Sequence, residues 1–243
     1  MILLSKELEA IAKNYHLSSN IKDKFIEDAC QHYCCEWLSS LIKPDDSVLE
    51  LGYGEGLTLA TLKKKTSDYT VVEGSYRLYK RVQELHPDVQ AEYSLFENFE
   101  GQRSYDKILA LHVLEHVTDP VETLRHSRNW MHLNSELIVI VPNRNSLHRK
   151  LALEMGLISS TDELSERDKV VGHQRVYSIQ NLRTDLEVAG FELLGEQGFF
   201  LKPFPNSMML EFSDEMIMAL NTISSKLPVD LMANIGLRAK IKA

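Results

Sequence analysis

The chain has 243 residues, of which 44% are hydrophobic and 26% are charged, and its formal net charge at pH 7 is −8. This length is sufficient to bury the core of one large α/β domain. The acidic balance disfavours non-specific nucleic-acid binding, and no apolar run reaches the roughly 18 residues that a transmembrane helix needs, so we expect neither a nucleic-acid partner nor a membrane span.

The N-terminal stretch MILLSKELEAIAKNYHLSS is apolar for only four residues before charges appear, which does not fit a secretory signal. The three cysteines, Cys30, Cys34 and Cys35, are odd in number and clustered, so they do not indicate a disulfide framework. Cys30 and Cys34 with nearby His32 have the spacing of metal ligands, but a buried helix face is the simpler interpretation. We therefore expect a cytoplasmic protein.

Along the chain, a helical region over residues 5–42 is followed by apolar runs that alternate with helical segments. Pro44 ends the first region, and Asp119 with Pro120 has the composition of a helix start. The expected strands are 47–52, 69–74, 89–93, 105–112 and 136–143, and the expected helices between them are 57–66, 75–87 and 119–131. After an irregular, polar stretch, Ser178 is expected to cap a further helix, and 191–197 and 199–204 are expected to be two closing strands.

This alternation predicts an α/β fold, a Rossmann-like doubly wound sheet of seven strands that is mostly parallel and has helices on both faces. The expected segments are an N-terminal helical cap (1–44), a ligand-binding core (45–143), a lid or substrate insertion (144–177), a closing helix and strands (178–205), and a C-terminal helical tail (206–243).

A glycine-rich loop follows the first expected strand. Gly52, Gly54 and Gly56 stand between this strand and a helix, where glycine permits a tight turn and lets a ligand approach the backbone closely. Backbone N–H groups at the helix start can then face the ligand. Glu73 ends the second strand, where a carboxylate can accept two hydrogen bonds from a ribose diol.

The spacing of these glycines separates two classes of nucleotide. A dinucleotide fingerprint needs its third glycine at position 57, which is Leu57. Glu50 lies just upstream and would repel a pyrophosphate, but it suits a ligand that carries positive charge. The stretch ELGYGEG (50–56) resembles the first motif, E-x-G-x-G-x-G, of the class I S-adenosylmethionine-dependent methyltransferases.

The resemblance extends over about residues 45–200. YDKILALHVLEHVTDP resembles the fourth motif of a subgroup that includes ubiquinone-biosynthesis O-methyltransferases and related small-molecule methyltransferases, and LIVIVPN and GHQRVYS resemble their later segments. The resemblance implies S-adenosyl-L-methionine as cofactor and a small molecule as methyl acceptor. The cofactor-binding residues that it implies are Glu50, Gly52, Gly54, Gly56, Glu73, Leu95, Phe96, His112 and Leu114.

Leu95 and Phe96 follow the third strand, where the family places its adenine contacts, although both residues could equally be core residues. Phe96 stands where an acid is often found, so Glu97 or a backbone carbonyl would have to recognise the adenine amino group.

The string HVLEH (112–116) also matches H-x-x-E-H, the signature of one class of zinc peptidases. Such a site needs His112 and His116 on one face of a helix. The apolar run KILAL leads directly into His112 and Pro120 starts the next helix, so the string is expected to span a strand end and a loop, and we expect no metal site. Next to the cofactor, His116 is a candidate general base, whereas Glu115 is expected to brace the loop.

His173 is the second candidate base, downstream of the expected insertion. The candidate substrate contacts that flank the insertion are Asn143, Arg149, Arg175 and Tyr177, of which the two arginines would suit an anionic acceptor. Each could equally be an ordinary surface or interface residue.

These patterns favour methyl transfer to an oxygen or a nitrogen of a small molecule. Two candidate bases favour oxygen, because a neutral amine can attack before it loses its proton. The alternatives are a non-catalytic S-adenosylmethionine-binding module, a zinc hydrolase that uses HVLEH, and a nicotinamide-dependent oxidoreductase. The N- or C-terminal helices are candidate contacts of a homodimer.

Overall fold

The computed structural model describes residues 2–18 and 22–242. The chain begins with α1 (Ile2–Ile11), which continues into a π-helical turn, η1 (Ala12–His16). The long helix α2 (Lys24–Leu41) follows and ends three residues before Pro44. The helical N-terminal region that the sequence predicts is thus present, in the form of two separate helices.

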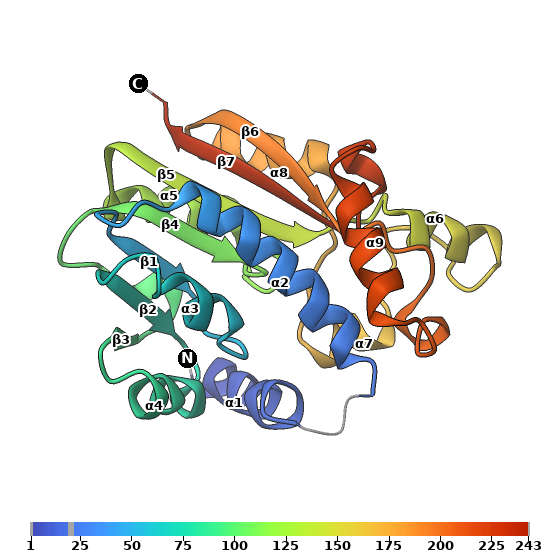
Figure 1. The fold of residues 1–243 in the computed structure, drawn as a ribbon. Helices are drawn as coiled ribbons and strands as arrows, with labels where there is room; N and C mark the ends of the chain where they lie inside the picture. Colours follow the sequence, from blue (N-terminus) through green and yellow to red (C-terminus); the bar gives the residue numbers. More distant parts are fainter. Residues whose placement is uncertain (1, 19–21, 243) are drawn as a thin grey trace.

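Seven strands form one sheet in the order β3-β2-β1-β4-β5-β7-β6 (Figure 1). The strands are β1 (Val48–Leu51), β2 (Tyr69–Glu73), β3 (Gln90–Tyr93), β4 (Tyr105–Leu111), β5 (Met131–Pro142), β6 (Phe191–Phe199) and β7 (Asn234–Ile241). The first five are parallel, and β7 pairs antiparallel with both β5 and β6. The predicted α/β fold is confirmed.

The helices of the core begin at the residues that the sequence marks as caps. The Asp119 side chain accepts a hydrogen bond from the Glu122 N–H at 3.0 Å, and the Ser178 hydroxyl accepts one from the Asn181 N–H at 3.2 Å. These helices are α3 (Leu57–Leu62), α4 (Tyr76–Leu85), α5 (Pro120–Ser127), α6 (Leu147–Glu154), α7 (Glu166–Val170), α8 (Ile179–Val188) and α9 (Asp214–Ser224). None of the helices in the described ranges is both long and apolar enough to span a bilayer.

Helices cover both faces of the sheet, and neighbouring strand residues point to opposite faces. Val48 and Leu109 pack in the cluster formed with α2, α3 and α4, whereas Leu49 and Ile108 pack in the cluster formed with α5 and α8. α2 crosses the first face and also contacts α9 (Figure 1). Burial of both faces explains why the strands are continuous apolar runs in the sequence.

The prediction of two closing strands at 191–197 and 199–204 is wrong in its second part. β6 runs without interruption to Phe199, and its partner β7 comes from the C-terminal tail, which was expected to be helical. Phe200 adopts a left-handed φ of 62°, which turns the chain out of the sheet, and Pro203 and Pro205 cannot donate ladder hydrogen bonds. The division into five segments stays a prediction, with the last segment contributing a core strand.

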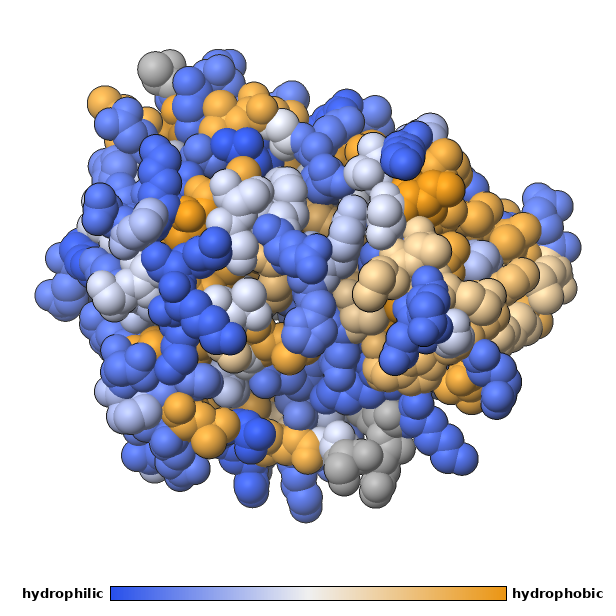
Figure 2. Space-filling view, viewed as in Figure 1, coloured by the Kyte–Doolittle hydropathy of each residue, from blue (hydrophilic) through white to orange (hydrophobic). Residues whose placement is uncertain are grey.

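The amphipathic helix predicted in the tail is α9. Its Ile217 is buried in the cluster formed with α2, whereas Met216 and Met218 are exposed. Leu153, Met155 and other apolar residues at α6 are also exposed, and Figure 2 shows apolar residues gathered on the side where α6 and α9 lie. Met216 and Met218 are therefore not part of the core.

The end of β5 is tied to the segment before β7 by Asn143, which is buried. Its Nδ2 donates to the carbonyls of Asp230 at 2.9 Å and Met232 at 2.8 Å, and its Oδ1 accepts from the Asn145 N–H at 3.0 Å. We expect Asn143→Ala to lower the free energy of unfolding by about 1–3 kcal/mol, because it leaves buried groups without partners. Urea denaturation measures this. The exposed Asn134→Ala, on β5, is the control and should change stability by less than about 0.5 kcal/mol; equal losses in both variants would contradict the assignment.

Candidate functional site

The site begins at the carboxyl ends of two adjacent parallel strands. Leu51 at the end of β1 pairs with Ala110 near the end of β4, so the loops that follow these strands emerge side by side. The strand order reverses direction at this point, between β1 and β4, which is where ligands bind in open α/β sheets. The two loops are the glycine loop (52–56) and the loop 112–118.

The glycine loop uses the conformational freedom of its glycines. Gly52, Gly54 and Gly56 have φ values of 82°, 54° and 80°, in the left-handed region that other residues rarely adopt. A Cβ at Gly56 would collide with the ring of Tyr53, which folds across it. A Cβ at Gly54 would meet nothing closer than the His16 ring at 3.9 Å, so the space above the centre of the loop is open to a ligand.

Two buried carboxylates lie under this loop. Glu73 accepts hydrogen bonds from the N–H groups of Tyr53 at 2.8 Å and Ser75 at 2.7 Å, and Glu50 accepts one from the Tyr69 hydroxyl at 2.8 Å. Burial raises the pKa of both carboxyls, that of Glu50 to about 8. Two buried acids fit a ligand that brings positive charge, and the open loop fits a nucleoside.

The predicted adenine contacts are next to the same loop. A Cβ at Gly52 would lie 3.7 Å from the Phe96 ring, and one at Gly74 would lie 3.1 Å from Leu95. Both side chains are half-buried and border the glycine loop and the end of β2. Their contact with a cofactor stays a prediction.

The N-terminal helices cover this edge of the sheet, and sequence reasoning did not identify which of their residues reach it. Glu9 of α1 accepts a hydrogen bond from the Tyr76 N–H at the start of α4. Glu55 in the glycine loop pairs with Lys24 of α2 at 3.0 Å and lies 3.3 Å from His16. These contacts join segments that are far apart in the chain, so no local pattern signals them.

The loop 112–118 contains HVLEH, and it is a loop, as predicted. His112 has a left-handed φ of 55°, and its N–H donates to the Ile140 carbonyl at 2.8 Å. Its Nδ1 lies 3.2 Å from Glu115 Oε1. The side chain of Leu114 is fully buried in the core, which leaves only its backbone to line the predicted cofactor site. The helical face that a zinc peptidase requires is not formed by His112 and His116.

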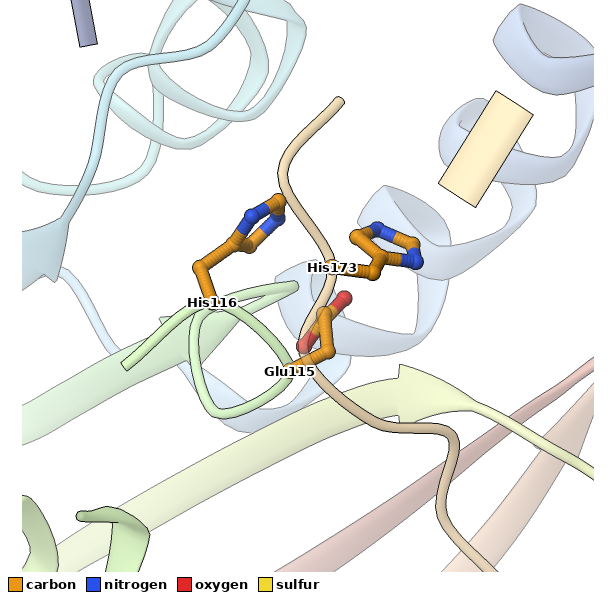
Figure 3. Close-up of side chains that lie close together, drawn as sticks. All are labelled: Glu115, His116 and His173. Carbon is orange, nitrogen blue, oxygen red and sulfur yellow. The ribbon is translucent and has the colours of Figure 1, made fainter. Parts of the chain in front are cut away.

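The structure brings both candidate bases together with Glu115 (Figure 3). The rings of His116 and His173 are 4.7 Å apart between centroids and nearly perpendicular, at 77°. One nitrogen of each histidine and one carboxylate oxygen of Glu115 all lie within 4.8 Å of one another. Glu115 is fully buried, and the two histidines are half-buried.

The segment 172–175 is clamped onto the loop 112–118. The N–H of Gln174 donates to the Glu115 carbonyl at 2.8 Å, and its Nε2 donates to the His116 carbonyl at 2.6 Å. Arg175 donates to the carbonyls of Leu114, Val117 and Thr118. The relative positions of His116 and His173 are therefore set by hydrogen bonds that the segment 172–175 donates to backbone carbonyls of the loop 112–118.

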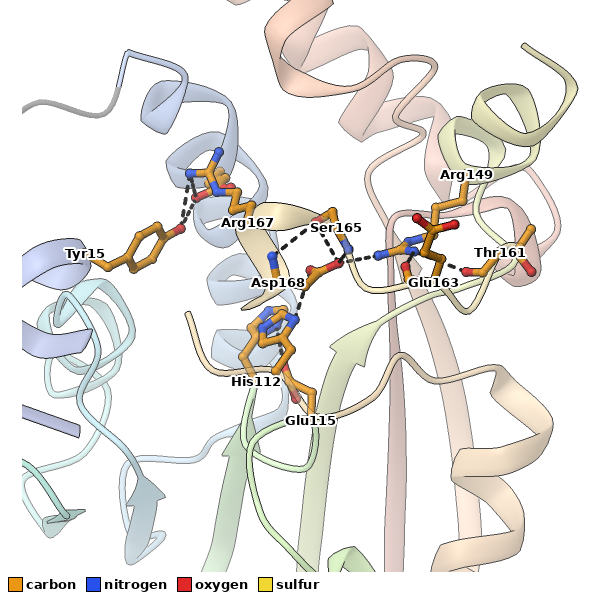
Figure 4. Close-up of polar contacts among 11 residues, drawn as sticks. Tyr15, His112, Glu115, Arg149, Thr161, Glu163, Ser165, Arg167 and Asp168 are labelled. Carbon is orange, nitrogen blue, oxygen red and sulfur yellow. Dashed lines mark hydrogen bonds and ion pairs between the residues drawn. The ribbon is translucent and has the colours of Figure 1, made fainter. Parts of the chain in front are cut away.

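Asp168 of α7 links His173 to the rest of the insertion, and Figure 4 shows the contacts of Asp168 with Ser165 and Arg149. Its Oδ1 lies 3.0 Å from His173 Nδ1, and its Oδ2 accepts from Arg149 Nη2 at 2.7 Å. Burial alone would raise the pKa of Asp168, but His173, Ser165 and Arg149 together hold it below its usual value. Sequence reasoning missed Asp168, whose only signal was its place in a capping box with Ser165.

The four predicted substrate contacts all have partners within the protein. Asn143 and Arg149 hold backbone carbonyls, Arg175 braces the loop 112–118, and the Tyr177 hydroxyl donates to Asp185 at 3.1 Å. Contact of these residues with a substrate stays a prediction.

The charges in the cluster are set by burial and by mutual contact. Burial lowers the pKa of His116 to about 4, so this imidazole is neutral at pH 7. For Glu115, burial raises the pKa, but the hydrogen bond from His112 and the positive charge of the His112 ring outweigh it and lower the pKa overall. The cluster thus holds an ionised carboxylate next to a neutral imidazole.

Comparison with known proteins gives a consistent result. A family model described as "Methyltransferase domain" matches residues 26–196. Among solved structures, a possible histamine N-methyltransferase from Thermotoga maritima has a TM-score of 0.66 at 19% identity, covering 96% of this chain and 99% of its own. A search of curated proteins finds no match.

Two further solved structures show the same fold. A putative methyltransferase from Haloferax volcanii, solved with the Trm112 methyltransferase activator, has a TM-score of 0.64 at 15% identity, covering 98% of this chain and 97% of its own. The CcbJ methyltransferase from Streptomyces caelestis has a TM-score of 0.61 at 14% identity, covering 98% and 99%.

The buried carboxyl of Glu50 makes stability depend on pH. Its pKa is about 8 in the folded chain against 4.5 for the ordinary group, so its ionisation is disfavoured in the folded state, and its contribution to stability falls as the pH rises from about 4.5 through 8. We expect Glu50→Gln to flatten this fall by on the order of 2–4 kcal/mol between pH 5 and 8.5.

Urea unfolding of wild type and Glu50→Gln at both pH values measures the effect. The exposed Glu84→Gln on α4 is the control and should keep the wild-type pH dependence. The assignment fails if Glu50→Gln loses as much stability on the alkaline side as wild type does.

Proposed function

We propose that this chain, which belongs to the methyltransferase domain family and is an S-adenosylmethionine-dependent methyltransferase, methylates an oxygen atom of a small-molecule acceptor. The observation that carries the proposal is the convergence of His116, His173 and the buried Glu115 beside the glycine loop. S-adenosylmethionine, when bound, supplies a methyl group that its sulfonium already activates. The protein's own residues therefore have to align the acceptor and manage its proton.

The residues of the glycine loop and of β2 are suited to hold the cofactor. Gly54 leaves space for close approach of the nucleoside, and Glu73 is at the end of β2, where a second lone pair on each oxygen remains for a ribose diol. Leu95 and Phe96 offer apolar surface for the adenine. Burial raises the pKa of Glu50 to about 8, and a ligand that carries positive charge would favour the ionised form of this carboxyl.

An oxygen acceptor explains the histidine pair better than a nitrogen acceptor does. A hydroxyl has to lose its proton as it attacks, whereas a neutral amine can attack first. The neutral His116 is able to accept that proton, and the ionised Glu115 stabilises the positive charge that results. The likeness of the loop 112–118 to that of ubiquinone-biosynthesis O-methyltransferases points the same way.

Nitrogen is the alternative acceptor. The Thermotoga maritima protein is described as a possible histamine N-methyltransferase, but at 19% identity its likeness extends to the fold and does not choose the acceptor atom. Analysis of the methylated product decides between the two.

The cofactor site is tested by Gly54→Arg. We expect wild type to bind S-adenosylhomocysteine with a Kd of about micromolar, and Gly54→Arg to show no binding, because the side chain fills the open space above the loop. Isothermal titration calorimetry measures both. Gly156→Arg is a matched control, since Gly156 also has a positive φ, 68°, but no atom lies within 4 Å of its added Cβ. Binding by Gly54→Arg equal to that of Gly156→Arg would refute this placement.

The acceptor is tested with a panel of phenols, alcohols and amines and isotope-labelled S-adenosylmethionine. We expect label on oxygen, and we expect His116→Gln to lower kcat by about 100-fold or more while S-adenosylhomocysteine binding stays unchanged. His132→Gln is the control, because His132 is an exposed residue that pairs with Asp106. Both residues lie at the starts of their strands, at the edge of the sheet opposite the glycine loop. Label on nitrogen alone, with full activity in His116→Gln, would exclude the oxygen proposal.

A further inference from the structure

We propose that Glu115, His116 and His173 bind a divalent transition-metal cation next to the glycine loop. The three side chains come from two segments that are more than fifty residues apart, yet one nitrogen from each histidine and one carboxylate oxygen lie within 4.8 Å of one another. Figure 3 shows a carboxylate oxygen of Glu115 directed toward the two imidazoles. A modest inward shift of these groups brings all three to coordination distance of one ion, about 2.0–2.2 Å.

A buried oxygen without a partner is the second observation. Glu115 is 0% exposed, and its Oε2 has no hydrogen-bond partner among the described residues, whereas Oε1 lies 3.2 Å from His112 Nδ1. A buried charged oxygen without a partner costs on the order of 1–3 kcal/mol or more. Nearly all buried polar atoms in proteins have a partner, so the unpaired Oε2 of Glu115 points to a ligand.

The surroundings of the cluster resemble the outer contacts of a metal site. Asp168 Oδ1 lies 3.0 Å from His173 Nδ1, a carboxylate–imidazole contact of the kind found behind metal-bound histidines, although the two atoms are not aligned as a hydrogen bond. Arg149 in turn fixes the other oxygen of Asp168 at 2.7 Å. Gln174 binds the backbone of both Glu115 and His116, which fixes their positions relative to His173.

The donor set selects the class of ion. Two imidazoles and one carboxylate suit borderline cations such as Zn²⁺, Co²⁺, Mn²⁺ and Fe²⁺, whereas Mg²⁺ prefers oxygen ligands. Three protein ligands leave coordination positions open for a small molecule. A cation held there would lower the pKa of an acceptor hydroxyl, with the proton passing to solvent, so that the cation would take over the role that His116 has as a base in the metal-free protein. That role rests on the proposed oxygen acceptor; the binding of the cation does not.

The test uses untagged, full-length protein that has been stripped with a chelator and dialysed. Calorimetric titration with Zn²⁺ and visible spectroscopy with Co²⁺ are expected to show one site with a Kd of micromolar or lower and visible absorption bands of bound Co²⁺. Mg²⁺ is titrated as a comparison and should bind at least tenfold more weakly. Glu115→Gln, His116→Gln and His173→Gln should each weaken Zn²⁺ binding by about tenfold or more, as expected for the loss of a ligand.

His132→Gln is the matched control and should bind Zn²⁺ like wild type. S-adenosylhomocysteine binding and thermal unfolding are measured for every variant, so that a misfolded Glu115→Gln is recognised and the half-buried His116→Gln carries the test instead. Absence of one-site binding in wild type, binding unaffected by all three cluster variants, or preference for Mg²⁺ would each overturn the proposal. Metal binding without oxygen methylation would leave this site standing and refute the proposed acceptor, whereas oxygen methylation without metal binding would do the opposite.

Discussion

The parallel pairing of β1 with β4 is the constraint on which the site depends. Because Leu51 and Ala110 are partners in the sheet, the glycine loop and the loop 112–118 leave the same edge as neighbours. The strand order reverses there, so α3 and α5, which follow the two strands, pack on opposite faces of the sheet. The edge between them is covered by the N-terminal helices instead. Glu115 and His116 are placed by the loop that follows β4, and His173 is placed by the hydrogen bonds of its segment to that loop.

The burial of three carboxyl groups near this edge is the second constraint. Glu50, Glu73 and Glu115 are almost fully buried, and an isolated buried carboxylate is strongly unfavourable. Glu73 accepts hydrogen bonds from backbone N–H groups, and Glu50 accepts one from a tyrosine hydroxyl. Glu115 contacts the ring of His112. The compensation is incomplete at Glu115, where one oxygen has no partner among the described residues. Such incomplete pairing is tolerated where a ligand completes it.

Much of the fold could be predicted because each local signal had a single structural meaning. Asp119 and Ser178 cap helices as their sequence context indicates, and the glycine spacing predicted the first loop. The last strand was missed although a signal is present. The sequence of β7, NIGLRAKI, alternates between apolar residues and polar residues or glycine, which is typical of a strand, and the prediction of a helical tail did not use it. The position of β7 between β5 and β6 depends on pairing with residues about 40 to 100 positions away, which no local pattern specifies.

The same reasoning applies to the candidate site and explains what was missed. His116 and His173 could be nominated separately by their chemistry, but their contact depends on the path of the insertion, which local patterns do not determine. Asp168 and Glu9 act only through such tertiary contacts.

Arg167 connects the insertion 144–177 with the N-terminal helices. It pairs with Asp23 and Glu27 at the start of α2 and lies against the ring of Tyr15 (Figure 4). It is carried by α7, the same helix that bears Asp168 and thus contacts His173. The contacts of α2 and the contact that holds His173 are therefore carried by the same short helix, α7.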